Sequence, residues 1–138
     1  MTPDRQTARP LRAPGLRRER LDEEWFHLFA LEPMVEQLRA EHAYRVNGHT
    51  GVTLLKNEHL RVVLEAARQD SRIGEHVVDG PSFVHVLDGS LRLACGDETR
   101  IAHAGEMVTI PHDRPRDVWA ETDASFLWVL ALEGEEAS

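Results

Sequence analysis

Residues 83–95 read FVHVLDGSLRLAC, and they hold two short segments that alternate apolar with other side chains around a single turn. Because successive side chains of a strand point to opposite faces, this alternation predicts strands with one buried face. Asp88-Gly89 between the segments is a typical turn dipeptide. We therefore predict a strand at 83–87, a tight turn, and a second strand at 91–95. Cys95 shares the apolar face of the second strand, so we interpret it as a core thiol rather than a nucleophile.

Alternating segments of this kind continue on both sides of the turn. Turn signals separate them about every 8–12 residues, a spacing typical of an all-β sandwich or barrel. Gly96-Asp97 predicts a hairpin, and Asn57-Glu58 predicts a turn between two strands. The sequence contains no βαβ unit, no P-loop and no GxGxxG motif, so nucleotide chemistry of those kinds is not indicated. We predict eight or so strands, including segments at 52–54, 60–66, 99–102, 107–110 and 118–132.

The charge of the 138-residue chain, −8 in total, is unevenly distributed. Residues 1–20 carry six arginines and two acids, a balance of +4, and we predict a disordered Arg-rich tail there. Residues 21–138 carry 10 basic and 22 acidic groups, a balance of −12. An acidic body is a poor surface for phosphates, so we expect no nucleic-acid partner. With one cysteine, no apolar run of 18 residues and no secretory signal, we expect a cytoplasmic protein without a membrane partner.

Residues 21–45 have a different, helical pattern. Leu21, Trp25 and Leu28 recur at helical spacing, and Pro33 suits the first turn of a second helix. We predict a helical arm of one broken helix or two short ones. The apolar stretch WFHLFAL at 25–31 could bind a membrane surface or a partner. We expect it instead to dock on the β-domain or on the second subunit of a homodimer.

Two segments resemble the paired motifs of the cupin superfamily, within a similarity over roughly residues 50–132. They are IGEHVVDGPSFVHVLDGSLRL at 73–93 and AGEMVTIPHDRPRDVWAE at 104–121. The chain looks most like the small single-domain cupins. The resemblance implies an antiparallel jelly-roll barrel with a pocket in its mouth, here over residues 46–133, followed by an acidic tail at 134–138. Many cupins bind Fe, Mn, Ni or Zn through His-x-His, a Glu and a further His.

The metal-ligand positions of that family are mostly filled by other residue types in this chain. The resemblance places the His-x-His pair on His76 and Val78, the Glu on Ser82, and the second-motif His on Arg116. An aliphatic group, a hydroxyl and a fixed cation replace three of the four ligands, and a guanidinium does not ordinarily bind a metal ion. The sequence thus indicates a degenerate metal site and favours the absence of a cofactor.

Arg116 motivates the first functional hypothesis, a cupin-like protein that binds a small polar or anionic ligand. A guanidinium directed into the interior can hold a carboxylate or phosphate in a bidentate manner. It can equally be a structural group paired with Asp113, Asp117 or Glu121. General acid–base work by His76 without a metal also stays open, so whether the chain is an enzyme is undecided. The ligand pocket that we predict consists of His76, Ser82, Val84, Arg116 and Val118.

The alternative hypothesis is a metal-dependent cupin enzyme, of dioxygenase or isomerase type, with an atypical histidine set. That set would be His76, His85 and His112. Strand parity puts His85 on the opposite face from Ser82, unless a bulge shifts the register. A third hypothesis is a structural or regulatory protein whose arm or basic tail docks on another chain.

Overall fold

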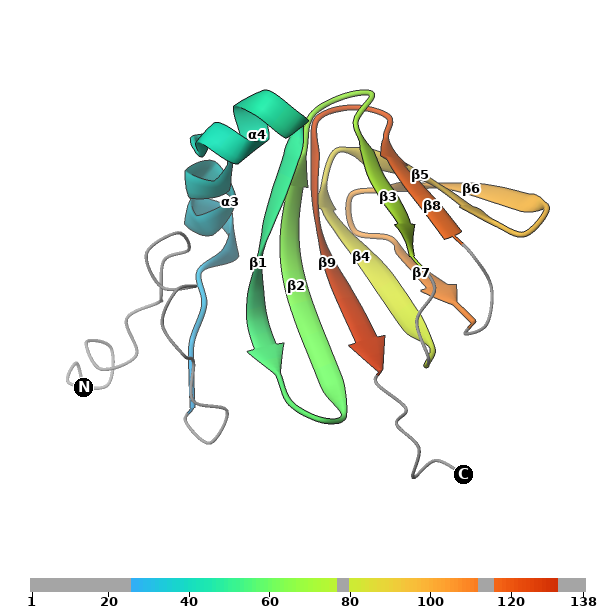
Figure 1. Cartoon of the computed structure of the whole chain (residues 1–138), viewed down its shortest axis with the longest axis horizontal. Coiled ribbons are helices and arrows are strands. Elements are labelled where there is room, and N and C mark those ends of the chain that lie inside the picture. Colours follow the sequence, from blue (N-terminus) through green and yellow to red (C-terminus); the bar gives the residue numbers. More distant parts are fainter. Residues whose placement is uncertain (1–25, 77–79, 112–115, 132–138) are drawn as a thin grey trace.

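The computed structural model describes residues 26–76, 80–111 and 116–131, with the backbone alone at 74–76 and 116. The predicted tails at 1–20 and 134–138 lie outside the described residues. Two helices are followed by nine strands in this part of the chain (Figure 1). They are α3 (Leu31–Arg39), α4 (His42–Asn47), β1 (His49–Lys56), β2 (Leu60–Ala67), β3 (Arg72–His76), β4 (Ser82–Asp88), β5 (Ser90–Cys95), β6 (Glu98–His103), β7 (Met107–Ile110), β8 (Arg116–Ala120) and β9 (Ala124–Ala131).

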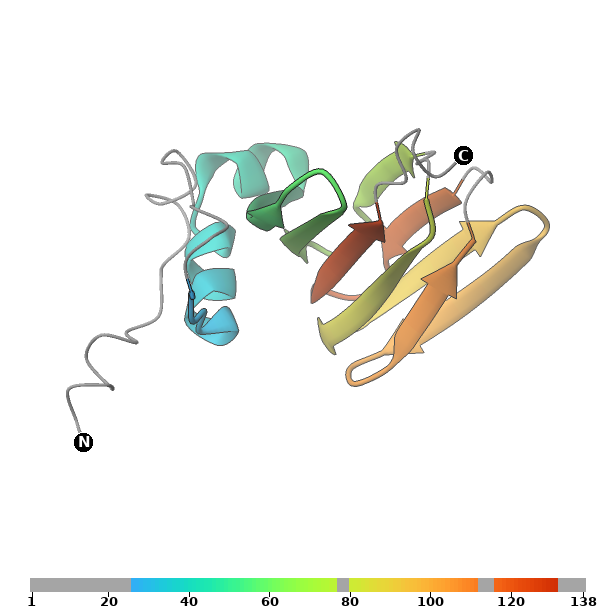
Figure 2. The ribbon, with the colours of Figure 1, turned by 90° about the horizontal axis from the view of Figure 1, so that it is seen from below.

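The strands form two antiparallel sheets. One has the order β1-β2-β9-β4-β7 and the other β3-β8-β5-β6. The predicted antiparallel β-architecture is therefore confirmed, and two helices precede the strands. None of the helices in the described ranges is long and apolar enough to cross a membrane. Figure 2 shows α3 and α4 at one end of the molecule, beside β1, and the β5–β6 hairpin at the other end.

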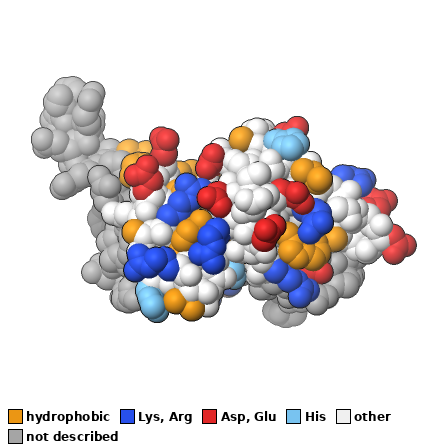
Figure 3. Space-filling model, turned by 90° about the horizontal axis from the view of Figure 1, so that it is seen from above, with side chains coloured by type: hydrophobic (Ala, Val, Ile, Leu, Met, Phe, Trp, Pro, Cys, Tyr) orange, Lys and Arg blue, Asp and Glu red, His pale blue; other side chains and the backbone are white. Residues whose placement is uncertain are grey.

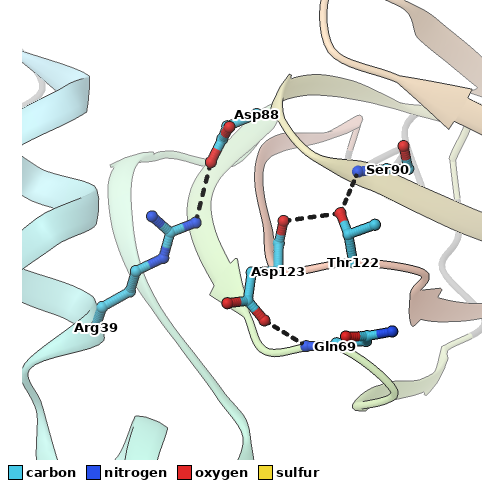
Figure 4. A network of polar contacts seen from close by, with 6 residues as sticks. All are labelled: Arg39, Gln69, Asp88, Ser90, Thr122 and Asp123. Atoms are coloured by element: carbon cyan, nitrogen blue, oxygen red, sulfur yellow. Dashed lines mark hydrogen bonds and ion pairs between the residues drawn. The ribbon is translucent and has the colours of Figure 1, made fainter.

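Gly89 marks the point where the chain passes from one sheet to the other, because β4 belongs to the first sheet and β5 to the second. Its φ of 78° is a left-handed conformation that favours glycine. An added Cβ would lie 2.1 Å from the Asp123 carbonyl oxygen, so the neighbouring chain also excludes a side chain. Next to the crossing, the Ser90 N–H donates to Thr122 Oγ1 at 3.1 Å, and the Gln69 N–H donates to Asp123 Oδ1 at 2.8 Å (Figure 4).

The interior between the two sheets is filled by apolar side chains. Val84 and Val86 on β4 meet Leu91 and Leu93 on β5 there, as the alternation predicts, and Phe126 is the largest fully buried side chain. A second apolar cluster lies on the outer face of the five-stranded sheet, beneath α3 and α4. Its members are Met34, Val35, Leu38, Tyr44, Val52, Leu54, Leu64 and Ala66.

The apolar face predicted for 60–66 is buried against the helices and not against the second sheet. Val62, Leu64 and Ala66 belong to the helix-covered cluster or pack against it, whereas Val63 and Ala67 belong to the interior. Both faces of β2 are therefore covered. The opposite face of β2, for which the alternation predicts no burial, lines the interior between the sheets. This face carries Glu65 between Val63 and Ala67.

The helical arm is two short helices that dock on the chain's own sheet. Residues 26–30 are not helical, in contrast to the prediction, and α3 begins at Leu31. Pro33 explains the late start, since a proline lacks the N–H and collides with the preceding turn unless it lies near a helix N-terminus. In the segment before α3, Phe26 is fully exposed and Leu28 is half exposed.

The outer face of the four-stranded sheet carries a row of charged side chains around one indole. Arg72, Trp119 and Arg92 are paired across β3, β8 and β5. The two guanidinium carbons lie 6.0 and 4.7 Å from the centroid of the Trp119 ring. Asp117 and Glu121 form ion pairs with these arginines. Side chains of both signs are interspersed on the face shown in Figure 3.

Candidate functional site

A cavity of about 530 Å³ lies where the edges of the two sheets come together, between β5, β6 and β7. We call it the edge cavity. β6 is the last strand of the four-stranded sheet, and β7 is the last strand of the five-stranded sheet. The lining residues are Leu93, Ala94, Cys95, Glu98, Arg100, Met107, Val108, Thr109, Ile110 and Pro111.

The edge cavity has an apolar wall and a charged rim. Leu93 and Ile110 are buried members of the interior cluster, and Cys95 and Val108 pack against that cluster. At the rim, Arg100 donates to Glu98 Oε1 at 2.9 Å, and both side chains are largely exposed. Ion pairs of this exposed kind contribute little to stability, so Arg100 can exchange its partner for another anion at small cost.

Backbone pairing brings the sequence-predicted residues to the same end of the two sheets as this cavity. Arg116 is paired with His76 on one side and with Cys95 on the other. In the facing sheet, Ser82 is paired with Ile110, and its side chain is buried. The pairing thus places the backbone of Arg116 next to Cys95 and that of Ser82 next to Ile110 in the cavity wall, with His76 beside Arg116.

The other two predicted pocket residues lie deeper. Val84 and Val118 are completely buried in the interior cluster and do not line the edge cavity. They form part of the apolar support beneath it.

The histidines of the metal hypothesis are not brought together in the described residues. His85 alternates with Val84 and Val86 on β4, and its paired neighbours are Met107 and Leu127. Leu127 packs against the helix-covered cluster, so His85 lies on the outer face of its sheet. His112 lies outside the described residues. The described ranges contain no group of three or more His, Cys, Asp or Glu side chains that could hold a metal ion.

By residue type, the four positions that the cupin resemblance assigns to metal ligands do not fit a metal. Among the positions derived from the resemblance, only His76 supplies a side chain type that commonly ligates a transition metal. Ser82, Val78 and Arg116 do not replace the missing donors.

Three charged residues were missed by the sequence analysis. Glu98 and Arg100 share the parity of the buried Ala102 on β6, and that parity was the available signal. Glu65 lies on the interior face of β2, between Val63 and Ala67, and interrupts an otherwise apolar face. The sequence signal for a buried carboxyl here was a glutamate that shares one face of a predicted strand with two apolar residues.

Glu65 has the most perturbed carboxyl group in the described residues. Burial raises its pKa to about 7, and the charge of Arg61 offsets part of that rise. Its Oε1 is buried without a hydrogen-bond partner. His49 Nδ1 lies 4.0 Å from this oxygen, which is beyond hydrogen-bond distance.

Comparison with known proteins agrees with the fold. Residues 62–131 match the family model described as "Cupin domain". No match was found among curated proteins.

Solved structures are similar at low sequence identity. A conserved protein of unknown function from Streptococcus pyogenes is 21% identical over 62% of this chain and 75% of that one, with a TM-score of 0.59. A cupin superfamily protein from Desulfitobacterium hafniense is 12% identical over 82% of this chain and 98% of that one, with a TM-score of 0.66. Salicylate 1,2-dioxygenase from Pseudoaminobacter salicylatoxidans is 19% identical over 59% of this chain and 24% of that one, with a TM-score of 0.55. At these identities the similarity shows the shared fold.

Proposed function

This chain belongs to the cupin domain family, and from that premise we propose that it binds a small anionic molecule in the edge cavity. The observation that carries the proposal is the cavity itself, with its apolar wall and its cationic rim residue Arg100. Its volume of about 530 Å³ falls within the roughly 300–1,000 Å³ usual for small-molecule sites.

Cationic residues support an anion as the ligand. Arg100 lines the cavity, and Arg116 is the backbone neighbour of Cys95 in the cavity wall. A guanidinium offers two parallel N–H groups that match a carboxylate or a phosphate. The surrounding body is acidic, with a balance of −12 over residues 21–138. Arg100 and Arg116 are therefore the groups that would attract an anion to this cavity, with Arg100 exchanging its exposed partner Glu98 for the ligand.

His76 and Ser82 would complete the polar contacts in this proposal. Each is adjacent in register to a residue at the cavity end of the sheets, namely Arg116 and Ile110. An imidazole and a hydroxyl can each donate a hydrogen bond to an anionic oxygen. The buried Val84 and Val118 would hold this end of the interior rigid without touching the ligand.

The test begins with a thermal-shift screen of the purified protein against small mono- and dicarboxylates and sugar phosphates, with sodium chloride and inorganic phosphate as ionic controls. Calorimetry then compares the wild type with Arg100→Ala, Arg116→Ala and the control Arg92→Ala. Arg92 lies on the outer face of β5 beside Trp119, away from the cavity.

Hydrogen bonds to charged groups contribute about 1.5–3 kcal/mol, so we expect either cavity substitution to weaken binding roughly 10- to 150-fold. Arg92→Ala should bind like the wild type. Unchanged binding in both Arg100→Ala and Arg116→Ala would reject the proposal.

We further propose that the chain forms a homodimer. Phe26 and Leu28, two exposed apolar side chains two residues apart ahead of α3, support this as the start of an apolar contact surface, since contiguous exposed apolar patches mark protein–protein interaction sites. Light scattering during size-exclusion chromatography should give about twice the chain mass of 15.6 kDa. A Phe26→Ser, Leu28→Ser double variant should elute as a monomer. A monomeric wild type would refute the homodimer.

A further inference from the structure

Glu65 lies on a strand between a central strand of its sheet, β9, and the edge strand β1. β2 is paired with β9 without interruption along its whole length, Leu60–Ala67. On its other side β2 is paired with β1, where the register shifts between Thr53 and Leu55. β1 is the last strand of its sheet, so it is hydrogen-bonded within the sheet along one edge only. Any local opening that reaches Glu65 is therefore easiest on the β1 side.

β1 also forms the lid over the Glu65 carboxyl. Gly51 is paired with Glu65, and a Cβ placed at Gly51 would lie 2.8 Å from the carboxyl carbon. His49, two residues away on the same face of β1, brings its Nδ1 to 4.0 Å from Oε1. The backbone of β1 thus lies directly against the carboxyl and restricts its access to water.

The groups around Glu65 offset a negative charge there only in part. From β9 the paired residue is Phe126, and the described interior-facing side chain of β3 is Ile73, both of them apolar. The charged or titratable groups near it are Arg61 on β2 and His49 on β1. Oε1 nevertheless lacks a hydrogen-bond partner. A neutral carboxyl is tolerated in such surroundings far better than a carboxylate, which needs hydration or a paired donor.

We propose that Glu65 is a proton-controlled latch for β1: the protonated carboxyl keeps β1 closed over it, and loss of the proton raises the frequency with which β1 opens. Opening lets water reach the carboxylate. It also uncovers Val52 and Leu54, which are buried beneath the helices, so the open form stays a minor population at any pH. The latch changes how often β1 opens and leaves the closed structure unchanged.

The direction and size of the effect follow from linkage. The carboxyl has a pKa of about 7 when closed and about 4.5 when hydrated. Opening therefore becomes more favourable as pH rises from 4.5 through 7, by up to about 300-fold in all. Between pH 5 and pH 8 the expected change is roughly 70-fold.

The experiment is amide hydrogen exchange of the full chain at pH 5, 6, 7 and 8, with rates corrected for intrinsic exchange. Glu65→Gln keeps the shape of the side chain and cannot ionise. Glu58→Gln is the matched control, because Glu58 lies in the β1–β2 turn beside His59, at 3.5 Å, but is exposed. We expect β1 amides of the wild type and of Glu58→Gln to lose protection roughly 70-fold over this range. Protection in Glu65→Gln should stay constant.

A loss of protection in Glu65→Gln equal to that in the wild type would overturn the latch. If Glu65→Gln does not fold, the wild type alone tests the proposal. The protection factors of β1 amides are then compared with those of β4 and β9. Protection factors of β1 that fall with pH and stay below those of β4 and β9 at every pH support the latch, because they show an opening smaller than global unfolding. Protection factors that are equal in all three strands at every pH, or a β1 protection that stays constant, overturn it.

Discussion

Replacing Glu65 with glutamine should stabilise the protein at neutral and alkaline pH and leave it nearly unchanged in acid. Burial favours the protonated carboxyl in the folded state, with a pKa of about 7, whereas the unfolded chain has a value of about 4.5. A raised carboxyl pKa means that the folded state binds a proton that the unfolded state has lost. The free energy of unfolding of the wild type therefore falls as pH rises from 4.5 through 7, and it stays low above that.

The size of this effect follows from the two pKa values. Their difference corresponds to a penalty of about 3 kcal/mol once both states are ionised. At pH 8 nearly all of it is present, and at pH 5 the penalty is below about 1 kcal/mol. Glutamine mimics the neutral carboxyl and should remove the penalty, so Glu65→Gln gains about 3 kcal/mol at pH 8. The side chain is only 17% exposed, so solvent screening lowers this value little.

Urea denaturation of the wild type, Glu65→Gln and the exposed control Glu58→Gln at pH 5 and pH 8 measures this directly. The expected result is a stabilisation of Glu65→Gln that grows by about 2.5 kcal/mol between the two pH values, at constant m-value. Glu58→Gln should differ from the wild type by less than about 0.5 kcal/mol at both. If the free energies of unfolding of Glu65→Gln and the wild type differ by the same amount at pH 5 and pH 8, the pKa of Glu65 is not raised in the folded state.

Three further predictions concern packing and the cavity. Gly51→Ala should lower the free energy of unfolding by about 1–3 kcal/mol in the same assay, because its Cβ would lie 2.9 Å from the Leu64 carbonyl oxygen; a neutral substitution would show that β1 can move aside. Phe126→Ala should cost about 3–5 kcal/mol, since Phe126 is fully buried between the sheets, and a loss below 1 kcal/mol would contradict that position. Cys95, the single cysteine, should react with a thiol reagent, and a bound ligand should slow that reaction because the residue lines the edge cavity. Unchanged labelling in the presence of a bound anion would place the ligand elsewhere.

The β-architecture could be predicted from sequence because its signals are local. Alternation marked the strands at 83–87 and 91–95, and the structure has β4 and β5 there. Gly96-Asp97 predicted the hairpin that joins β5 to β6. β3 was not predicted, since its sequence RIGEH contains a single apolar residue, Ile73. Its pairing with β8 depends on partners 40 to 47 residues away, to which sequence patterns give no access.

The candidate site was less predictable because it depends on which sheet edges meet. The edge cavity combines β6 and β7, and no motif links Arg100 to Ile110. Alternation along 60–66 showed a buried face but could not show that the opposite face was buried as well. For that reason Glu65 was not recognised. The cupin resemblance pointed to Ser82 and Arg116, and their pairing with Ile110 and Cys95 places their backbone at the cavity end of the sheets. A role for them in ligand binding stays a prediction.

The location of a bound anion tests most directly whether the edge cavity is the binding site. Two-dimensional ¹H–¹⁵N NMR spectra would follow the backbone amides while the best carboxylate or phosphate from the thermal screen is added. Binding in the edge cavity predicts saturable shifts concentrated at Cys95, Arg100 and Ile110, with little change in α3 and α4. Saturable shifts confined to the helices or to the outer face around Trp119 would contradict it, as would a complete screen in which no anion binds.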